Sequence, residues 1–319
     1  GKKFLFDHHD INPELYEAKF GRRDFGWKLM VWLERLSFRT AHRSIATNES
    51  YREIAITRGG MDPGKVHIVR SGPNLDRVRE VEPDPKWRNG RRFVVGYVGV
   101  IGKQEGLDLL LESVSHLVNV RKRDDIQFVI CGGGPELEAI KAESTTMGLA
   151  DYVTFARRFF DLTDINQRVV IAPDVNTPVA FEHETLFSAL STSDVCVNPD
   201  RPTAMNDKST MNKIMEYMAL GKPIVQYDLR EGRFSAREAS LYARCTDPAD
   251  FGDKIAELLD DPERRAAMGA FGRERVRNEL AWNYEAPKLL AAYEALFTGR
   301  KGMQSHSTLT EAAPRGGEQ

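Results

Sequence analysis

Three polar residues, Asn212, Lys213 and Glu216, lie three to four positions apart in a segment with helical periodicity. Ser209 or Thr210 can cap the start of this predicted helix. The N–H groups of a helix start, an ammonium and a carboxylate together suit a nucleoside diphosphate. The amides and the ammonium would bind phosphate, and the carboxylate would hold ribose hydroxyls. On spacing alone, an ordinary amphipathic helix explains the segment equally well.

The same helix is well delimited by its sequence. Ile214, Met215 and Met218 fall at helical spacing and are expected to face a core. Gly221 can end the helix in a left-handed conformation, and Pro223 prevents its continuation. The apolar residues that follow predict a buried strand.

Glycines follow two other predicted strands. Gly99 and Gly102 come after the apolar run FVVGYV, and they would let the backbone approach a phosphate closely. Gly133 lies in a run of three glycines that either serves the same purpose or makes a tight turn from strand to helix. Lys103 and Arg70 are the candidate sources of positive charge near these glycines.

The segment DHHD at residues 7–10 could be a metal-binding cluster, or its histidines could hydrogen-bond the surrounding loop. The chain has no DxD sequence at an obvious strand end and no His or Cys cluster with ligand spacing. The sequence therefore favours a site that works without a metal.

Composition narrows the class of protein. The chain has 319 residues, 41% hydrophobic and 29% charged, which predicts a globular protein of about two domains. A net charge of -2 argues against general nucleic-acid binding. No stretch has the apolar length of a membrane span. Three widely spaced cysteines predict reduced thiols, so we expect a cytoplasmic protein.

Strands and helices alternate along the chain, which predicts parallel sheets of the α/β class. In the later part, the ligand should lie beyond the carboxyl ends of the strands. The predicted divisions are part of an N-terminal domain (1–75), a linker and hinge (76–92), a second domain (93–281) with an inserted loop or hairpin (161–182), a last helix (282–298) and a disordered tail (299–319).

Seven segments, in order, resemble the retaining glycosyltransferases of family 4, also called group 1 glycosyltransferases. EYMALGKPIV at residues 216–225 resembles the helix and strand of their donor site. The others are DHHDINPELYEAKFG (7–21), IATNESY (45–51), VHIVRSGPN (66–74), GYVGVIGKQEGLDLLL (96–111), VICGGGPE (129–136) and DVCVNPD (194–200). They look most like the subgroup that builds bacterial capsular, exopolysaccharide and O-antigen chains.

The resemblance implies the GT-B fold, with two Rossmann-like doubly wound domains. Because the chain opens with Gly1 and a strand, about half of a typical ~150-residue N-terminal domain is expected to be missing. The implied enzyme is metal-independent and uses no cofactor. It transfers a hexose from a nucleoside diphosphate sugar to a glycan or polyprenyl-linked acceptor in surface polysaccharide biosynthesis, with retention of anomeric configuration.

The resemblance also assigns roles to residues. His9 with Asp10 matches the family's histidine near the transferred sugar, and these two are the expected catalytic residues. The expected donor-binding residues are Gly99, Gly102, Lys103, Gly133, Ser209, Thr210, Lys213 and Glu216.

The chain departs from the family pattern at three positions. Val100 and Glu105 stand where the family has an arginine and a lysine aimed at phosphate. Lys208 stands where the family has the first of two glutamates, and Asp207 beside it is a candidate substitute. These departures put the usual donor contacts in doubt.

Residues 22–43 combine four aromatic side chains with several arginines and lysines. Such a basic amphipathic helix could lie on the inner face of the plasma membrane, where a lipid-linked acceptor would be found, or pack its aromatics onto the sheet. Two other functions remain open: a non-catalytic GT-B binding or regulatory subunit, and a nucleotide-sugar 2-epimerase, against which the EYMALGKP segment speaks.

Overall fold

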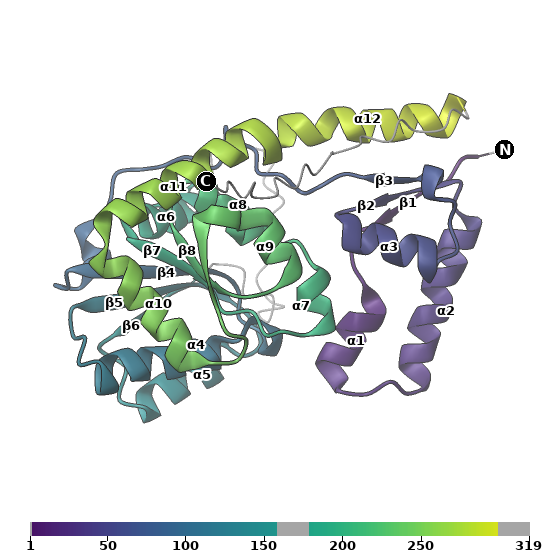
Figure 1. Cartoon of the computed structure of the whole chain (residues 1–319). Coiled ribbons are helices and arrows are strands. Elements are labelled where there is room, and N and C mark those ends of the chain that lie inside the picture. Colours follow the sequence, from purple (N-terminus) through teal and green to yellow (C-terminus); the bar gives the residue numbers. More distant parts are fainter. Residues whose placement is uncertain (1, 158–178, 299–319) are drawn as a thin grey trace, which may run out of the picture.

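The computed structural model describes residues 2–157 and 179–298, which form two parallel β-sheets with helices around them (Figure 1). The first sheet has the strand order β1-β2-β3, and the second has the order β6-β5-β4-β7-β8-β9. All described strand pairs are parallel. The predicted α/β class is therefore confirmed.

The first sheet is small, and residues at the ends of its helices stop or cap them. Asp24 accepts hydrogen bonds from the first amides of α2, and Asn48 does so for α3. Gly21 ends α1 with a φ of 64°, in the left-handed region. The elements are β1 (Leu5–His8), α1 (Asn12–Phe20), α2 (Phe25–Thr40), β2 (Arg43–Ala46), α3 (Glu49–Thr57) and β3 (Val66–Ile68).

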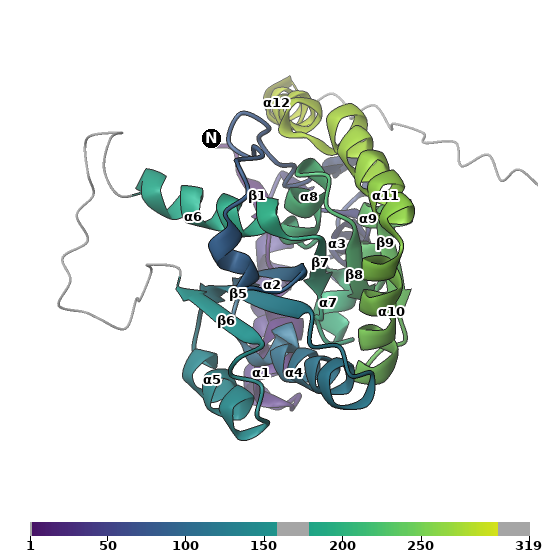
Figure 2. The ribbon, with the colours of Figure 1, turned by 90° about the vertical axis from the view of Figure 1, so that its left-hand side faces the viewer.

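The second sheet is larger, and helices cover both of its faces (Figure 2). Its strands are β4 (Phe93–Val100), β5 (Ile126–Gly133), β6 (Val153–Arg157), β7 (Val195–Asn198), β8 (Ile224–Tyr227) and β9 (Ser240–Ala243). Its helices are α4 (Leu107–Ser115), α5 (Leu137–Thr146), α6 (Val179–Thr192), α7 (Ala204–Lys208), α8 (Asn212–Ala219), α9 (Arg230–Ala236), α10 (Pro248–Asp260) and α11 (Pro262–Arg275). Short 3₁₀ turns include η2 (Pro85–Arg88) and η3 (Lys103–Glu105).

Side-chain alternation along β4 divides the core of the second sheet into two layers. Phe93, Val95 and Tyr97 pack into the layer that contains α4 and α10. Val94 and Val98 pack into the opposite layer, with α6 and α8. A strand that is apolar on both faces has to be central in a doubly wound sheet, and β4 is central here.

Helix α12 (Trp282–Thr298) runs from the second sheet back over the first, where it packs on β2 and β3 (Figure 1). Residues 76–92, the predicted linker and hinge, connect the two sheets, and their later part is bound to the second. Backbone amides of Val81 and Asp84 donate to Ser191 and Thr192 of α6, and Trp87 is buried. The segment from Val81 to Trp87 is therefore attached to the second sheet.

Two other expectations meet the structure only in part. The insertion predicted at residues 161–182 and the tail predicted at 299–319 lie outside the described residues, except that α6 begins at Val179. Strand β9 was not predicted. In the part of the chain that the structure describes, no helix has the length and apolarity needed to cross a bilayer.

Candidate functional site

The order of the second sheet reverses between β4 and β7, because later strands are added on one side of β4 and then on the other. Loops that leave two such strands diverge and open a crevice at their carboxyl ends. Here Gly99 lies near the end of β4, Glu105 follows that strand, and Asp200 follows β7. Helix α8 begins beside them and contributes Lys213.

Lys213 lies at this reversal of the strand order. Its Nζ lies 2.7 Å from Glu105 Oε2 and 2.9 Å from Asp200 Oδ1, and 4.9 Å from the centre of the Tyr97 ring. A Cβ added to Gly99 would lie 3.5 Å from the same Nζ, so the backbone of β4 passes close to the ammonium. The Tyr97 hydroxyl donates to the carbonyl of Val100 at 3.0 Å and to Glu105 at 3.2 Å. We call Lys213, Glu105, Asp200 and Tyr97 the Lys213 cluster.

Burial and charge set the ionisation of this cluster. Burial disfavours the ammonium of Lys213, but Asp200 and the other nearby negative groups outweigh it, so its pKa lies well above the usual value. Burial also opposes ionisation of Glu105, yet Lys213 holds the pKa of this carboxyl below its ordinary value. Burial raises the pKa of Asp200 to about 7, although Lys213 counteracts it. Asp200 Oδ2 is buried without a hydrogen-bond partner, which is consistent with a carboxyl that ionises reluctantly.

The glycines allow a close approach between the paired ends of β4 and β5 and between the segments that follow them. A Cβ on Gly132 would lie 2.0 Å from the carbonyl oxygen of Gly99, and one on Gly134 would lie 2.4 Å from that of Ile101. The Gly133 carbonyl accepts the amide of Ile101 at 2.9 Å. The glycine run thus packs the end of β5 against the loop after β4, which favours the tight-turn interpretation of this run.

The start of α8 differs from the prediction. Neither Ser209 nor Thr210 caps it: the helix begins at Asn212, Met211 occupies the N-cap, and no side chain caps it. The reason is that a separate helix, α7, ends at Lys208, so residues 209–211 form a short connection between two helices. The other end agrees with the prediction, since Gly221 has a φ of 65°.

The hydroxyls of this connection bind the first sheet instead. Asn48 Nδ2 donates to the Lys208 carbonyl at 2.8 Å and to Thr210 Oγ1 at 3.0 Å. The Tyr51 hydroxyl lies 3.0 Å from Ser209 Oγ. Sequence reasoning missed Asn48 and Tyr51, although both lie in the segment IATNESY, and it also missed Asp200, which directly follows a predicted strand.

The predicted catalytic pair lies at the carboxyl end of β1. His9 and Asp10 are exposed, whereas the neighbouring His8 is buried with its Nε2 3.2 Å from Glu34. Helix α1, which follows them, contacts both α7 and η3. Residues 9 and 10 therefore lie in the loop between β1 and α1, on the side of the first sheet that contacts α7 and η3 (Figure 1).

The other predicted residues are placed as follows. Lys103 is exposed, and its carbonyl accepts from Arg201 Nε at 3.2 Å. Gly102 ends the loop before η3, and Glu216 is half-buried one turn along α8 from Lys213. Arg70 is buried over the ring of Phe234 at 4.1 Å, at the contact between the sheets.

The candidate substitute Asp207 and the departures at Glu105 and Val100 have the following surroundings. Asp207 Oδ1 accepts the amide of Arg230 at 2.9 Å, so this carboxylate serves the start of α9. Glu105 pairs with Lys213, as described above. Val100 is exposed.

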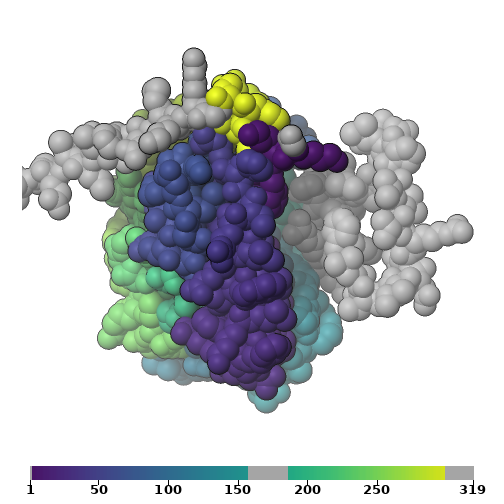
Figure 3. Space-filling view, turned by 90° about the vertical axis from the view of Figure 1, so that its right-hand side faces the viewer, coloured from purple at the N-terminus to yellow at the C-terminus, as the bar shows by residue number. Residues whose placement is uncertain are grey.

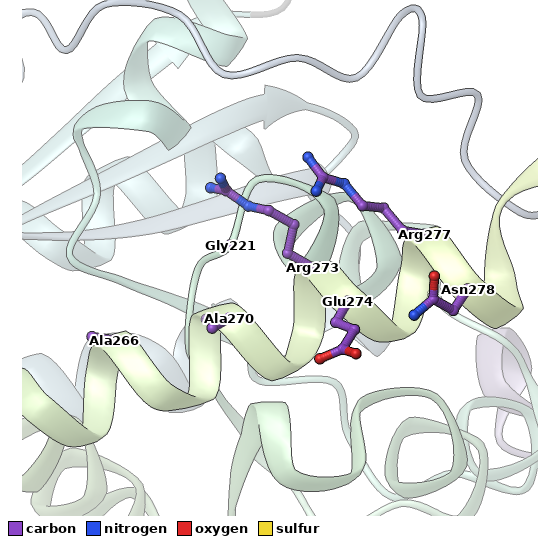
Figure 4. A pocket seen from close by; sticks show the side chains of 8 residues that line it. Gly221, Ala266, Ala270, Arg273, Glu274, Arg277 and Asn278 are labelled. Atoms are coloured by element: carbon purple, nitrogen blue, oxygen red, sulfur yellow. The ribbon is translucent and has the colours of Figure 1, made fainter.

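A surface pocket of about 650 Å³ lies elsewhere, along α11 (Figure 4). Arg273 and Arg277 line it, but Arg273 Nη2 is already bound to Glu80 and to the Leu220 carbonyl. None of the predicted site residues lines this pocket. Among the described residues, no three His, Cys, Asp or Glu side chains are grouped so that they could hold a metal ion.

Comparison with known proteins places the chain in a family. The profile of the family described as glycosyl transferase-like matches residues 119–291, which is more than half of the 319 residues. The chain belongs to this glycosyltransferase family. The group 1 assignment made from the sequence motifs agrees with it.

Relatives and a solved structure support the same conclusion. The chain is 27% identical over 315 residues to alpha-maltose-1-phosphate synthase of Mycolicibacterium smegmatis, covering 92% of this chain and 73% of the relative. It is 29% identical over 231 residues to GDP-mannose-dependent alpha-(1-6)-phosphatidylinositol monomannoside mannosyltransferase of Mycobacterium tuberculosis, covering 68% of this chain and 53% of the relative. This glycosyltransferase thus spans about half the length of the second relative.

The fold is similar to that of sucrose-phosphate synthase from Thermosynechococcus elongatus, with a TM-score of 0.72 at 20% identity, over 93% of this chain and 69% of that chain. The GT-B fold expected from the sequence is therefore confirmed.

Proposed function

We propose that this glycosyltransferase moves a hexose from a nucleoside diphosphate sugar to a glycan or lipid-linked acceptor, with retention of anomeric configuration, in surface polysaccharide biosynthesis. The observation that carries the proposal is the position of Lys213. A buried ammonium at the start of a helix lies at the switch point of a doubly wound sheet, beside the backbone of Gly99. Positive charge and close backbone approach at that point suit a diphosphate.

In the proposed mechanism the main demand on the protein is to stabilise negative charge on the leaving diphosphate. Lys213 and the amides at the start of α8 supply that stabilisation, with Gly99, Gly102 and Gly133 allowing close approach. The leaving phosphate then accepts the proton of the incoming hydroxyl on the same face of the sugar, so no protein nucleophile forms a bond. Glu216 holds the ribose, and His9 with Asp10 contacts the transferred sugar from the first sheet.

Titration calorimetry with UDP, GDP and their hexose conjugates tests the donor site, without added metal. We expect one base to bind, and the Glu216→Ala variant to weaken that binding by at least about tenfold through loss of the ribose contact. Glu112→Ala, an exposed carboxylate on α4, is the matched control and should bind like the parent. If Glu216→Ala binds the nucleotide as tightly as Glu112→Ala does, Glu216 is not part of the donor site.

The surface of α2 supports a contact with membrane lipid in this proposal. Phe38 is buried in the first sheet, but Phe25 is 80% exposed and Trp32 is 57% exposed. Arg23 and Lys28 lie on the same helix or just before it. The helix thus packs one aromatic inward and leaves others exposed. Figure 3 shows the face of the molecule that the N-terminal segment, including α2, forms. Exposed aromatics among cations suit an anionic lipid surface at the inner leaflet, where a polyprenyl-linked acceptor lies.

Vesicle sedimentation tests this contact. The chain should sediment with vesicles containing phosphatidylglycerol and not with pure phosphatidylcholine vesicles. The double variant Phe25→Ser, Trp32→Ser should lose most of this binding while UDP or GDP affinity is retained. Unchanged sedimentation of the double variant would show that α2 is not the contact.

One observation favours a binding or regulatory subunit as the second candidate function. The positive charge of Lys213 is already matched by two carboxylates, so the cluster as it stands has no unmatched positive charge to offer a donor. The two functions differ in turnover. A transferase hydrolyses bound nucleotide sugar slowly even without acceptor, whereas a binding subunit would hold the sugar intact, and chromatography of the nucleotide after long incubation separates them.

A further inference from the structure

The two carboxylates bound to Lys213 differ in their access to water. The side chain of Asp200 is 1% exposed, and that of Lys213 is 9% exposed. The side chain of Glu105 is 16% exposed. Asp200 is therefore the inner partner of the ammonium, and Glu105 lies between the ammonium and the solvent. An anion that enters from solvent meets Glu105 before it reaches Lys213.

Glu105 is also the partner that is easier to displace. It belongs to η3, a single 3₁₀ turn of three residues that lies between Gly102 and Gly106. Its carboxylate is otherwise held by the hydroxyl of Tyr97, which is shared with the Val100 carbonyl. A partly exposed glutamate can rotate into water at modest cost, whereas Asp200 has no such route.

We propose that Glu105 occupies the place of a donor phosphate at Lys213, and that a nucleoside diphosphate binds there by displacing Glu105 from the ammonium. The proposal rests on the donor site of the proposed function and adds a residue that sets its affinity. Asp200 stays in place as the inner partner of Lys213 and keeps the ammonium oriented in both states. The exchange replaces one anion by another, so Lys213 never loses its outer partner.

This arrangement has a measurable consequence. Each binding event has to break the Glu105 contact first, so Glu105 lowers the affinity for any ligand that uses its phosphates at Lys213. It leaves the affinity for an uncharged nucleoside unchanged, because the base and ribose contacts do not involve Lys213. Weakening the contact between Glu105 and Lys213 should therefore tighten diphosphate binding. Loss of a residue that binds the ligand would have the opposite effect.

The test compares Glu105→Gln with the parent chain by calorimetry, with UDP, GDP, uridine and guanosine as probes. The amide keeps the size and the acceptor oxygen of the side chain but removes its charge. We expect the preferred diphosphate to bind about tenfold tighter or more, and the nucleoside to bind equally well. Glu112→Gln removes one charge from the exposed face of α4 and should behave like the parent.

A second variant keeps the proposal testable if Glu105→Gln folds poorly. Tyr97→Phe preserves every charge and removes only the hydroxyl that holds Glu105, so diphosphate binding should tighten by about threefold. If the parent binds a diphosphate and neither variant binds it more tightly, the displacement of Glu105 is refuted and the donor site stands. If neither the parent nor Glu105→Gln binds any diphosphate, the donor site itself fails and the displacement falls with it.

Discussion

A buried ion cluster lies beside each of the two sheets. The first cluster connects helices, and the second forms the candidate site. In the first sheet, Arg58 donates to Glu14 at 2.7 Å and to Glu34 at 2.5 Å, and Glu34 also contacts His8. These residues come from α1, α2, β1 and the end of α3, so the cluster joins every helix of this part. In the second sheet, the Lys213 cluster joins the start of α8 to β4, to η3 and to the residue Asp200 after β7, all at the carboxyl edge of the strands.

The surroundings explain the difference. The second sheet has two extensive apolar layers and does not need ion pairs to hold its helices. The first sheet has a much smaller apolar core and exposes large apolar side chains on α1 and α2, so its helices depend more on polar contacts. Composition alone therefore cannot separate a structural cluster from a candidate site. Position relative to strand ends and glycines can.

The largest effect expected is on stability, from the cluster of the first sheet. Arg58→Met leaves Glu14 and Glu34 buried without their cation, so the free energy of unfolding should fall by about 3 kcal/mol. Urea denaturation followed by Trp fluorescence measures it. Arg244→Met, at an exposed arginine, is the control and should change stability little. A loss for Arg58→Met no larger than for this control would contradict the structural role.

Lys213→Met should impair nucleotide binding more than stability, in contrast to Arg58→Met. Affinity for UDP or GDP should fall by about thirtyfold or more, because a charged contact to phosphate is lost. Stability should fall less than in Arg58→Met, because Asp200 can take up a proton and Glu105 can turn to solvent. Calorimetry and urea denaturation on the same two variants give a direct comparison. A Lys213→Met variant that is as unstable as Arg58→Met and binds nucleotide normally would reverse the assignment of the two clusters.

The contact between the sheets should give an intermediate effect. Asn48→Ala removes the bonds to Lys208 and Thr210 and the cap of α3, and it should lower stability by about 1–2 kcal/mol. Nucleotide affinity should fall severalfold, because the connection before α8 is no longer held. Asn48→Asp keeps the cap through its carboxylate and loses the donor, so it should recover the stability of α3 but not the affinity. If Asn48→Asp restores both, Asn48 acts only as a helix cap.

The sequence predicted local structure well wherever local chemistry decides it. The periodicity of Ile214, Met215 and Met218 and the stop at Gly221 predicted most of α8 and its buried face. The alternation of strands and helices predicted the class of fold, and the motifs predicted the family. What failed was the start of α8, because Ser209 and Thr210 have first-sheet partners about 160 positions away.

The same limit applies to the site. Lys213 was identified from its own helix, but its partner Glu105 lies 108 positions away, and Asp200 lies 13 positions away, before α7. No pattern in the sequence indicates which carboxylate an ammonium will contact after folding. Glu105 could be noted only as a negative residue where the family has a lysine, and the structure turns that substitution into a specific ion pair.

The smallest expected effect is the pH dependence of donor binding, and its sign follows from Asp200. Burial raises the pKa of this carboxyl to about 7, so below pH 7 it is protonated and the ammonium is matched by Glu105 alone. Above pH 7 it ionises and adds a negative charge that repels the diphosphate. Affinity for the preferred nucleotide sugar, whose phosphates do not titrate in this range, should therefore rise by up to about tenfold from pH 8 to pH 6. Tyr97 and Tyr217 also face Lys213, but burial raises the pKa of both phenols, so they stay neutral throughout. Asp200→Asn should bind equally at both pH values, and a pH dependence that persists in this variant would assign it to another group.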